Sequence, residues 1–343
     1  MLGLPEIDKS HRTELLMRLG RALQKQEVSA TFWACLQVGD LSALERFVRE
    51  VEASPRLCKV LSHSFDALPR LWRQKALGEG FSDIDTELSS NHSSGSQASD
   101  KLWTATMSPS AADIARSRDG KKCVITGTTC LNPSQIFPLS LLKPKATTDI
   151  NGSLPNIWEI LNLLFDYEHV LQWKSAILQS PDGMDTVPEN LICLCPMIHI
   201  DWVDAYCAFK PLYLSPDRRE LTLEFHWLPT ETHSPRDHVS LFKSPSSSKN
   251  LQGTGNRYAI TADLKLVKSG HVFVLKTHNP VTHPLPSIAL LDMAWKLSQI
   301  VRLSGARDED LGGLQKDYNT PHLYNLQAIR EWAAESSSYA HKV

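Results

Sequence analysis

Apolar residues recur at helical spacing over the first eighty residues of the chain. In 10–23, leucines lie three or four positions apart, which is the period of an amphipathic helix. A second such segment follows Asp40, and a third covers 56–72 with a proline interrupting it near its end. Ser10 and Asp40 are residue types that cap helix N-termini. The pattern predicts an N-terminal helical region over 1–80 that packs against the rest of the chain.

Alternating apolar and polar positions appear in the C-terminal half. They cover 220–227 and 271–277, and this period of two predicts two strands that pair with one another. The stretch between them, 229–260, is rich in Ser, Pro and Lys and predicts a flexible excursion. Ser287 is placed to cap a following helix, which Gly305 ends.

Composition divides the remaining chain. A Ser-rich run over 81–109 has no apolar period and cannot bury enough surface to offset its ordering entropy. It is therefore predicted to be a linker. The expected organisation is a helical region, a linker, a core, an excursion, a strand with a helix packed on the core, and a tail: 1–80, 81–109, 110–228, 229–260, 261–305 and 306–343.

The central core contains the most specific pattern. It holds Arg-Asp-Gly at 118–120, Cys-Val-Ile-Thr-Gly at 123–127, Ser-Gln-Ile-Phe-Pro at 134–138, and Asn-Leu-Ile-Cys-Leu-Cys-Pro-Met-Ile-His at 190–199. We expect a strand over 122–126. Prolines and turn residues follow it and predict a long loop.

This arrangement resembles the ββα-metal core of the HNH endonucleases. The Phe137-Pro138 and Lys210-Pro211 flanks are similar to the fungal HNH-like family in particular. The resemblance implies an α+β fold: an HNH-like core with a helical insertion, N-terminal helices, and a C-terminal β-hairpin plus helix. In that family a histidine is the general base, an asparagine orients the loop, and a histidine on the following helix helps to hold a divalent cation.

The sequence keeps the asparagine and the second histidine of that pattern, as Asn190 and His199, and has Gln135 where the base would stand. A histidine with a pKa near 6.5 can accept a proton from water at neutral pH, whereas a glutamine amide only donates and accepts hydrogen bonds. General-base catalysis is worth about 10²–10⁴-fold. The exchange therefore weakens the prediction of nuclease activity more than the prediction of the fold.

The cysteines also depart from the family. Many HNH domains bind a structural zinc with two Cys-x-x-Cys pairs, but here Cys123 is followed by Thr126, and Cys195 by Ile198. Two thiolates do not complete a tetrahedral zinc site. We therefore expect buried thiols, no metal and no cofactor.

Charge and targeting signals narrow the expected partners. The chain has a net charge of −2, and 113–227 contains ten Lys and Arg against fourteen Asp and Glu. Nucleic-acid affinity depends on cationic contacts to phosphates, so the balance argues against a nucleic-acid partner. Seven cysteines, no long apolar run and no signal-like N-terminus predict a cytoplasmic protein without a membrane span, with the nucleus as the alternative. The oligomeric state stays open.

Two aspartates near His199 and four C-terminal histidines are not expected to form a site. Asp201 and Asp204 do not share the helix face of His199 and are expected to face solvent. Four histidines in the C-terminal strand region have no metal-ligand spacing and are expected to be structural or surface residues: His226, His271, His278 and His283.

Three function classes remain: a metal-dependent HNH DNA endonuclease, a non-catalytic interaction protein, and a metal-independent small-molecule cyclase. The third is favoured, because a cyclase needs neither base nor metal but benefits from a hydrogen bond to a substrate carbonyl and from a restrained reactive conformer. The fungal resemblance suggests, by analogy only, a pericyclase of Diels–Alder [4+2] type in a terpenoid or polyketide pathway.

The cyclase hypothesis assigns roles to named residues. Gln135, Asn190 and His199 are the predicted catalytic residues. A small hydrophobic substrate is expected in an apolar pocket between the 155–178 helices and the 118–211 core. Its predicted binding residues are all apolar: Ile136, Phe137, Trp158, Phe165 and Trp202.

Overall fold

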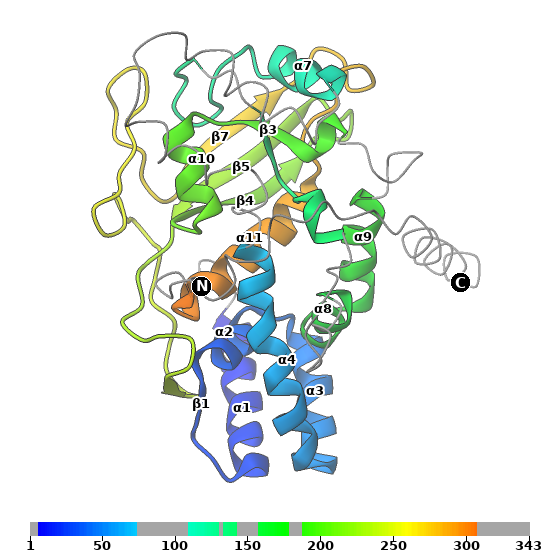
Figure 1. The fold of residues 1–343 in the computed structure, drawn as a ribbon, viewed down its shortest axis with the longest axis vertical. Coiled ribbons are helices and arrows are strands. Elements are labelled where there is room, and N and C mark those ends of the chain that lie inside the picture. Colours follow the sequence, from blue (N-terminus) through cyan, green and yellow to red (C-terminus); the bar gives the residue numbers. More distant parts are fainter. Residues whose placement is uncertain (1–5, 74–108, 130–132, 143–156, 178–186, 307–343) are drawn as a thin grey trace, which may run out of the picture.

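Helix α11 (Ile288–Leu303) crosses the middle of the molecule, with a sheet on one side and helices on the other (Figure 1). Ser287 caps it as expected, because its Oγ accepts a hydrogen bond from the Leu290 N–H. Most of its side chains are buried. Neither this helix nor any other in the described part of the chain has the length and apolarity needed to cross a membrane. The computed structural model describes these residues: 6–73, 109–129, 133–142, 157–177 and 187–306.

The described N-terminal residues form a helical bundle, as predicted. Its apolar faces meet in an aromatic core, where Phe32 stacks on Phe65 with ring centroids 5.4 Å apart and Phe47 contacts both edge-on. The first helix begins at Glu6, so Ser10 lies within it and does not cap it, and the fourth helix continues through Pro69. The helices are α1 (Glu6–Leu23), α2 (Ala30–Val38), α3 (Leu41–Ala53) and α4 (Pro55–Arg73).

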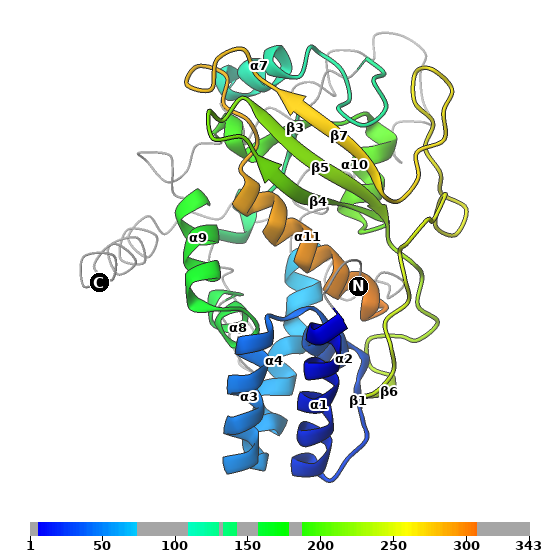
Figure 2. The same cartoon turned by 180° about the vertical axis from the view of Figure 1, so that it is seen from behind.

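The three-stranded antiparallel sheet has the order β4-β5-β7. Its strands are β4 (Cys207–Leu214), β5 (Glu220–Trp227) and β7 (His271–Lys276), so the predicted pairing of the two alternating segments is confirmed. One face packs on α10 (Pro196–Val203), where Trp202 and Phe209 have ring centroids 5.0 Å apart. The other face meets α11 (Figure 2).

A second, two-stranded antiparallel sheet lies within the central core. It consists of β2 (Pro133–Gln135) and β3 (Leu191–Cys193), with Gln135 opposite Leu191. The expected strand over 122–126 is not formed. Instead the chain turns back on itself, since Gly127 has a φ of +71° and the Cys123 N–H bonds to the Thr128 carbonyl.

Helix α7 (Pro109–Arg118) packs on this small sheet. Helix α10 follows β3 directly, and the long connection from β2 to β3 contributes two helices that cover α11 and the N-terminal bundle. The remaining described helices are α8 (Ile157–Leu164) and α9 (Tyr167–Ile177), with 3-10 turns at Leu139–Leu142 and Pro188–Asn190.

The segment 229–260, expected to be a flexible excursion, follows a defined path. It reaches the N-terminal bundle, where β6 (His238–Ser240) pairs with β1 (Glu27–Ser29). The buried Glu231 carboxylate binds Lys243 Nζ at 3.0 Å. This path also meets the end of α11, since a Cβ at Gly305 would lie 2.0 Å from the His233 carbonyl oxygen. Tertiary contacts thus fix a segment whose composition resembles that of a linker.

The described parts of the predicted segments pack together in one structure. The 261–305 segment supplies β7 to the core sheet and α11 to its face, as expected. Helix α11 also packs on α2 and α4 of the N-terminal bundle. The predicted linker over 81–109 and the tail over 306–343 lie almost entirely outside the described residues.

Candidate functional site

Asn190 holds together the two halves of the central motif. Its Oδ1 accepts a hydrogen bond from the Phe137 N–H at 2.7 Å, and its Nδ2 donates to the Phe137 carbonyl at 2.8 Å. The Asn190 carbonyl accepts from the Ile136 N–H at 2.8 Å. Because both ends of the amide are engaged by backbone, Asn190 positions the loop that follows Gln135.

Gln135 and His199 occupy neighbouring elements of the same motif. Gln135 ends β2 and is 5% exposed, and His199 lies on α10 and is 8% exposed. Strand β2 pairs antiparallel with β3, and α10 follows β3. The catalytic roles of these residues stay predictions.

The predicted substrate-binding residues are buried in several aromatic groups. Phe137 stacks on Trp158 with centroids 6.2 Å apart and approaches Trp72 of α4. Phe165 meets Trp173 at 4.9 Å. Ile136 is fully buried, and Trp202 packs under the sheet. These contacts describe core packing between elements, and their role in binding stays a prediction.

An open pocket lies elsewhere, where the N-terminal bundle, α9, β4 and α11 meet. Its volume of about 850 Å³ is within the range of small-molecule sites, roughly 300–1,000 Å³. The 155–178 segment supplies Asp166 and His169, and the core supplies Lys210 and Pro211, so the place agrees in part with the expected one. The walls differ from the expected apolar lining, because most of the lining residues are charged or polar. None of the eight predicted site residues lines it.

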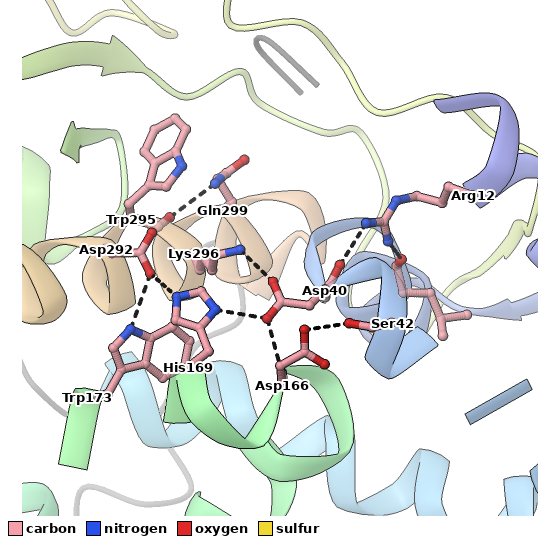
Figure 3. Close-up of polar contacts among 12 residues, drawn as sticks. Arg12, Asp40, Ser42, Asp166, His169, Trp173, Asp292, Trp295, Lys296 and Gln299 are labelled. Atoms are coloured by element: carbon pink, nitrogen blue, oxygen red, sulfur yellow. Dashed lines mark hydrogen bonds and ion pairs between the residues drawn. The ribbon is translucent and has the colours of Figure 1, made fainter. Parts of the chain in front are cut away.

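Four charged side chains from three distant parts of the sequence line this pocket and contact one another (Figure 3). His169 Nδ1 lies 2.8 Å from Asp40 Oδ2, and its Nε2 lies 2.6 Å from Asp292 Oδ2. Lys296 Nζ donates to Asp40 Oδ1 at 3.0 Å, and Trp173 Nε1 donates to Asp292 Oδ2 at 3.2 Å. We call Asp40, His169, Asp292 and Lys296 the charged cluster.

Local structure explains why Asp40 reaches this cluster. It stands at the N-cap position of α3, as predicted, but its side chain makes no capping hydrogen bond. The preceding Gly39 permits close approach to α8, since a Cβ there would lie 2.7 Å from the Leu164 carbonyl oxygen. That carbonyl accepts the Asp40 N–H at 2.8 Å. The carboxylate is thereby directed to α9 and α11.

Contacts within the charged cluster set the protonation states of His169 and Asp40. Burial disfavours the His169 imidazolium, but hydrogen bonds to Asp292 and Asp40 outweigh it and raise the pKa to about 9. Burial alone would raise the pKa of Asp40, yet the His169 hydrogen bond and the Lys296 charge hold it well below its usual range. His169 is thus a cation at neutral pH with both N–H groups occupied. It cannot accept a proton from a substrate in this state.

Other groups of the pocket remain available to a ligand. Lys210 reaches the pocket from β4. Gln37 of α2 also lines the pocket and is only 5% exposed. Trp295 gives the pocket an aromatic surface, and Lys296 binds Asp40 through one of three possible donors. The pocket therefore presents hydrogen-bond donors beside an apolar surface.

Sequence reasoning missed this site because no motif spans it. Asp40, His169 and Asp292 are separated by more than a hundred residues at each step. Two signals were present: an Asp at a helix start, and the Lys210-Pro211 pair noted as a flank of the core. Neither indicates a partner on α9 or α11.

The acidic residues near His199 differ from expectation in part. Asp201, expected to face solvent, is 1% exposed, and its Oδ1 lies 3.3 Å from Arg257 Nη1. Burial raises the pKa of Asp201 to about 6. Asp204 is half-buried. The 229–260 segment supplies Arg257, so a contact distant in sequence decides the environment of Asp201.

The C-terminal histidines form no metal site in the described structure. His226 is buried, its Nε2 lies 3.0 Å from Glu224 Oε2, and burial lowers its pKa. The rings of His278 and His283 lie 4.4 Å apart, and His271 is exposed on β7. Across the described ranges, no group of three or more His, Cys, Asp or Glu side chains has an arrangement that could hold a metal ion.

Comparisons with protein-family models, with curated proteins and with solved structures gave no match.

Proposed function

We propose that this chain is an enzyme that binds a small organic molecule in the pocket around the charged cluster and promotes a metal-independent cyclisation of it. An HNH-like frame, inferred from the sequence resemblance, would supply the scaffold. The pocket replaces the motif around Gln135 as the proposed reaction site. Its lining favours a substrate with both an apolar part and a carbonyl or carboxylate group.

The observation that carries this proposal is the double engagement of His169. An imidazolium between two carboxylates is a poor proton acceptor but a fixed charge. Because its charge does not change near neutral pH, the field in the pocket is preorganised. Such a site suits a reaction that shifts electron density without transferring a proton.

Lys210 and Lys296 are the groups proposed to act on the substrate. Both line the pocket from opposite elements, β4 and α11. A cationic donor near a substrate carbonyl stabilises the density that moves to that oxygen, by about 2.7–4 kcal/mol for a well-placed donor. Trp295, next to Lys296 on α11, lines the pocket and offers an apolar surface that can hold the reacting chain in a folded conformer.

A mass-neutral conversion tests the proposal, because an intramolecular cyclisation is an isomerisation. The purified full chain is added to a metabolite extract from a strain of the source organism that lacks the gene, with and without EDTA. We expect one compound to be replaced by an isomer of identical mass and different retention time, at a rate that EDTA does not change.

Matched lysine variants connect that conversion to the pocket. Lys210→Met removes the donor and keeps the length of the side chain, whereas Lys265→Met removes an exposed lysine outside the pocket, 77% exposed and paired with Asp263. The proposal requires a slower conversion for Lys210→Met alone. An absence of any mass-neutral conversion, or equal rates for both variants, contradicts it.

A further inference from the structure

Cys123 and Cys195, the remnants of the two expected cysteine pairs, meet in the folded structure. Each thiol shifts the pKa of the other, as expected for two side chains that lie close together. Thr126 contacts both: its N–H donates to Cys123 Sγ at 3.4 Å, and its Oγ1 donates to Cys195 Sγ at 3.8 Å. Both cysteines are unpaired thiols, with Cys123 buried and Cys195 partly exposed. This dithiol lies apart from the pocket, since neither cysteine lines it.

The backbone around each sulfur favours a thiolate. Cys123 accepts the amide N–H of the third following residue, Thr126, in a turn that Gly127 closes. Cys195 stands at the N-cap of α10, where the backbone amide of Ile198 acts to lower the pKa of its thiol. Amide donors and a helix N-terminus both stabilise negative charge on sulfur.

The two thiols titrate as a pair. The hydrogen bond from Cys195 lowers the pKa of Cys123 to about 6, and the same bond raises the pKa of Cys195. One proton is therefore shared between two sulfurs at neutral pH. The contrast is Cys35 in the N-terminal bundle, where burial raises the pKa of an isolated thiol.

We propose that Cys123 and Cys195 form a redox-active dithiol that a peroxide oxidises to a reversible disulfide joining the 119–129 turn to the start of α10. In the first step a thiolate sulfur attacks the peroxide, an S–O bond forms, the O–O bond breaks, and hydroxide leaves. In the second step the other thiol attacks the sulfenic sulfur, the S–S bond forms, and water leaves with the shared proton. The dithiol loses two electrons, and the peroxide gains them.

Disulfide formation suits this pair better than metal binding does. A closed zinc site needs four ligands, and the two sulfurs have no third metal-ligating partner within the described structure. Thr126 and Ile198 stand where the expected cysteine pairs would have supplied the other two thiolates. Two sulfurs that share Thr126 as a hydrogen-bond donor need only a local movement to join.

Peptide mapping of the reduced full chain tests the proposal. The protein is treated with hydrogen peroxide, quenched with iodoacetamide, digested and analysed by mass spectrometry. We expect a cross-linked peptide pair containing Cys123 and Cys195 that dithiothreitol separates, while Cys35 stays reduced as an internal control. The rate should be half-maximal near pH 6, because it follows the thiolate.

A single variant tests whether the two thiols react together to form a disulfide or are oxidised independently. In Cys195→Ser the sulfenic acid formed on Cys123 has no resolving thiol, so dimedone should trap it there. The wild-type map decides the proposal even if this variant fails to fold. Cross-linking of Cys195 to Cys130 or Cys193 contradicts the proposal, as does oxidation of Cys195 to the sulfinic acid without a cross-link.

Discussion

Asp40 and Asp292 share one histidine. His169 Nδ1 lies 2.8 Å from one carboxylate and Nε2 lies 2.6 Å from the other, so a single side chain of α9 joins the start of α3 to the middle of α11. Asp40 also binds Lys296. The pocket therefore depends on a network that also connects three parts of the fold.

Replacing His169 should destabilise the protein. His169→Gln keeps at most one hydrogen bond and removes one positive charge, which leaves Lys296, bound to Asp40, to offset two carboxylates. We expect the free energy of unfolding to fall by about 2–3 kcal/mol, below the full value for a buried pair because the side chain is 27% exposed. Urea denaturation measures this change. His271→Gln, on the exposed edge strand, is the matched control and should stay within about 0.5 kcal/mol of wild type.

The same network predicts a pH dependence of stability. The pKa of His169 is raised to about 9, so its contribution is complete below the unfolded pKa of about 6.5 and is lost as the pH rises through 9. The pKa of Asp40 is lowered, so its contribution is present above about pH 4 and is lost in acid. The stability difference between wild type and His169→Gln should shrink from pH 6 to pH 10 in thermal-unfolding scans. A difference that grows over this range would contradict the assignment.

Replacing Asn190 should destabilise the loop at Phe137 that its side chain holds. Asn190→Ala removes two hydrogen bonds and leaves the buried N–H and carbonyl of Phe137 without their partner. We expect a loss of about 2–4 kcal/mol in unfolding free energy and faster hydrogen exchange of the Phe137 amide. Asn279→Ala, which removes two exposed backbone contacts, is the control and should change stability by less than about 1 kcal/mol. Unchanged exchange at Phe137 would rule out this positioning role.

Two variants decide between the two sites considered for cyclisation. The sequence suggested Gln135 as the donor, and the pocket assigns that role to Lys210. We expect Lys210→Met to slow the conversion by about 10²–10³-fold, the loss typical of one oxyanion donor, and Gln135→Ala to leave it nearly unchanged. Circular dichroism confirms that both variants fold. If Gln135→Ala slows the conversion and Lys210→Met does not, the central motif around Gln135 is the reaction site.

The nuclease alternative makes its own testable claim. Since Gln135 replaces the base and the cysteine pairs are incomplete, we expect no stoichiometric zinc by elemental analysis and poor cleavage of plasmid DNA with magnesium or manganese. His199→Ala should not change any residual cleavage. Efficient cleavage that His199→Ala abolishes would establish a metal nuclease.

The sequence by itself determined the elements that depend on local period. Apolar residues in a helical repeat gave the N-terminal bundle and α11, and alternation gave β5 and β7. Between Asn190 and His199 the chain forms strand β3 and then begins helix α10. Three-residue β2 could not be read in the same way, because so short a strand shows no period.

Only the tertiary structure decided where charges meet. Asp40 looked like a helix cap, and its role changed because packing of α11 against the bundle brought Asp292 and Lys296 to it. The same holds for Cys123 and Cys195. In the sequence they belong to two separate incomplete cysteine pairs, and the turn after Cys123 brings them together. Sequence periods report which face of an element is buried, whereas such contacts depend on the relative placement of whole elements, which no local pattern records.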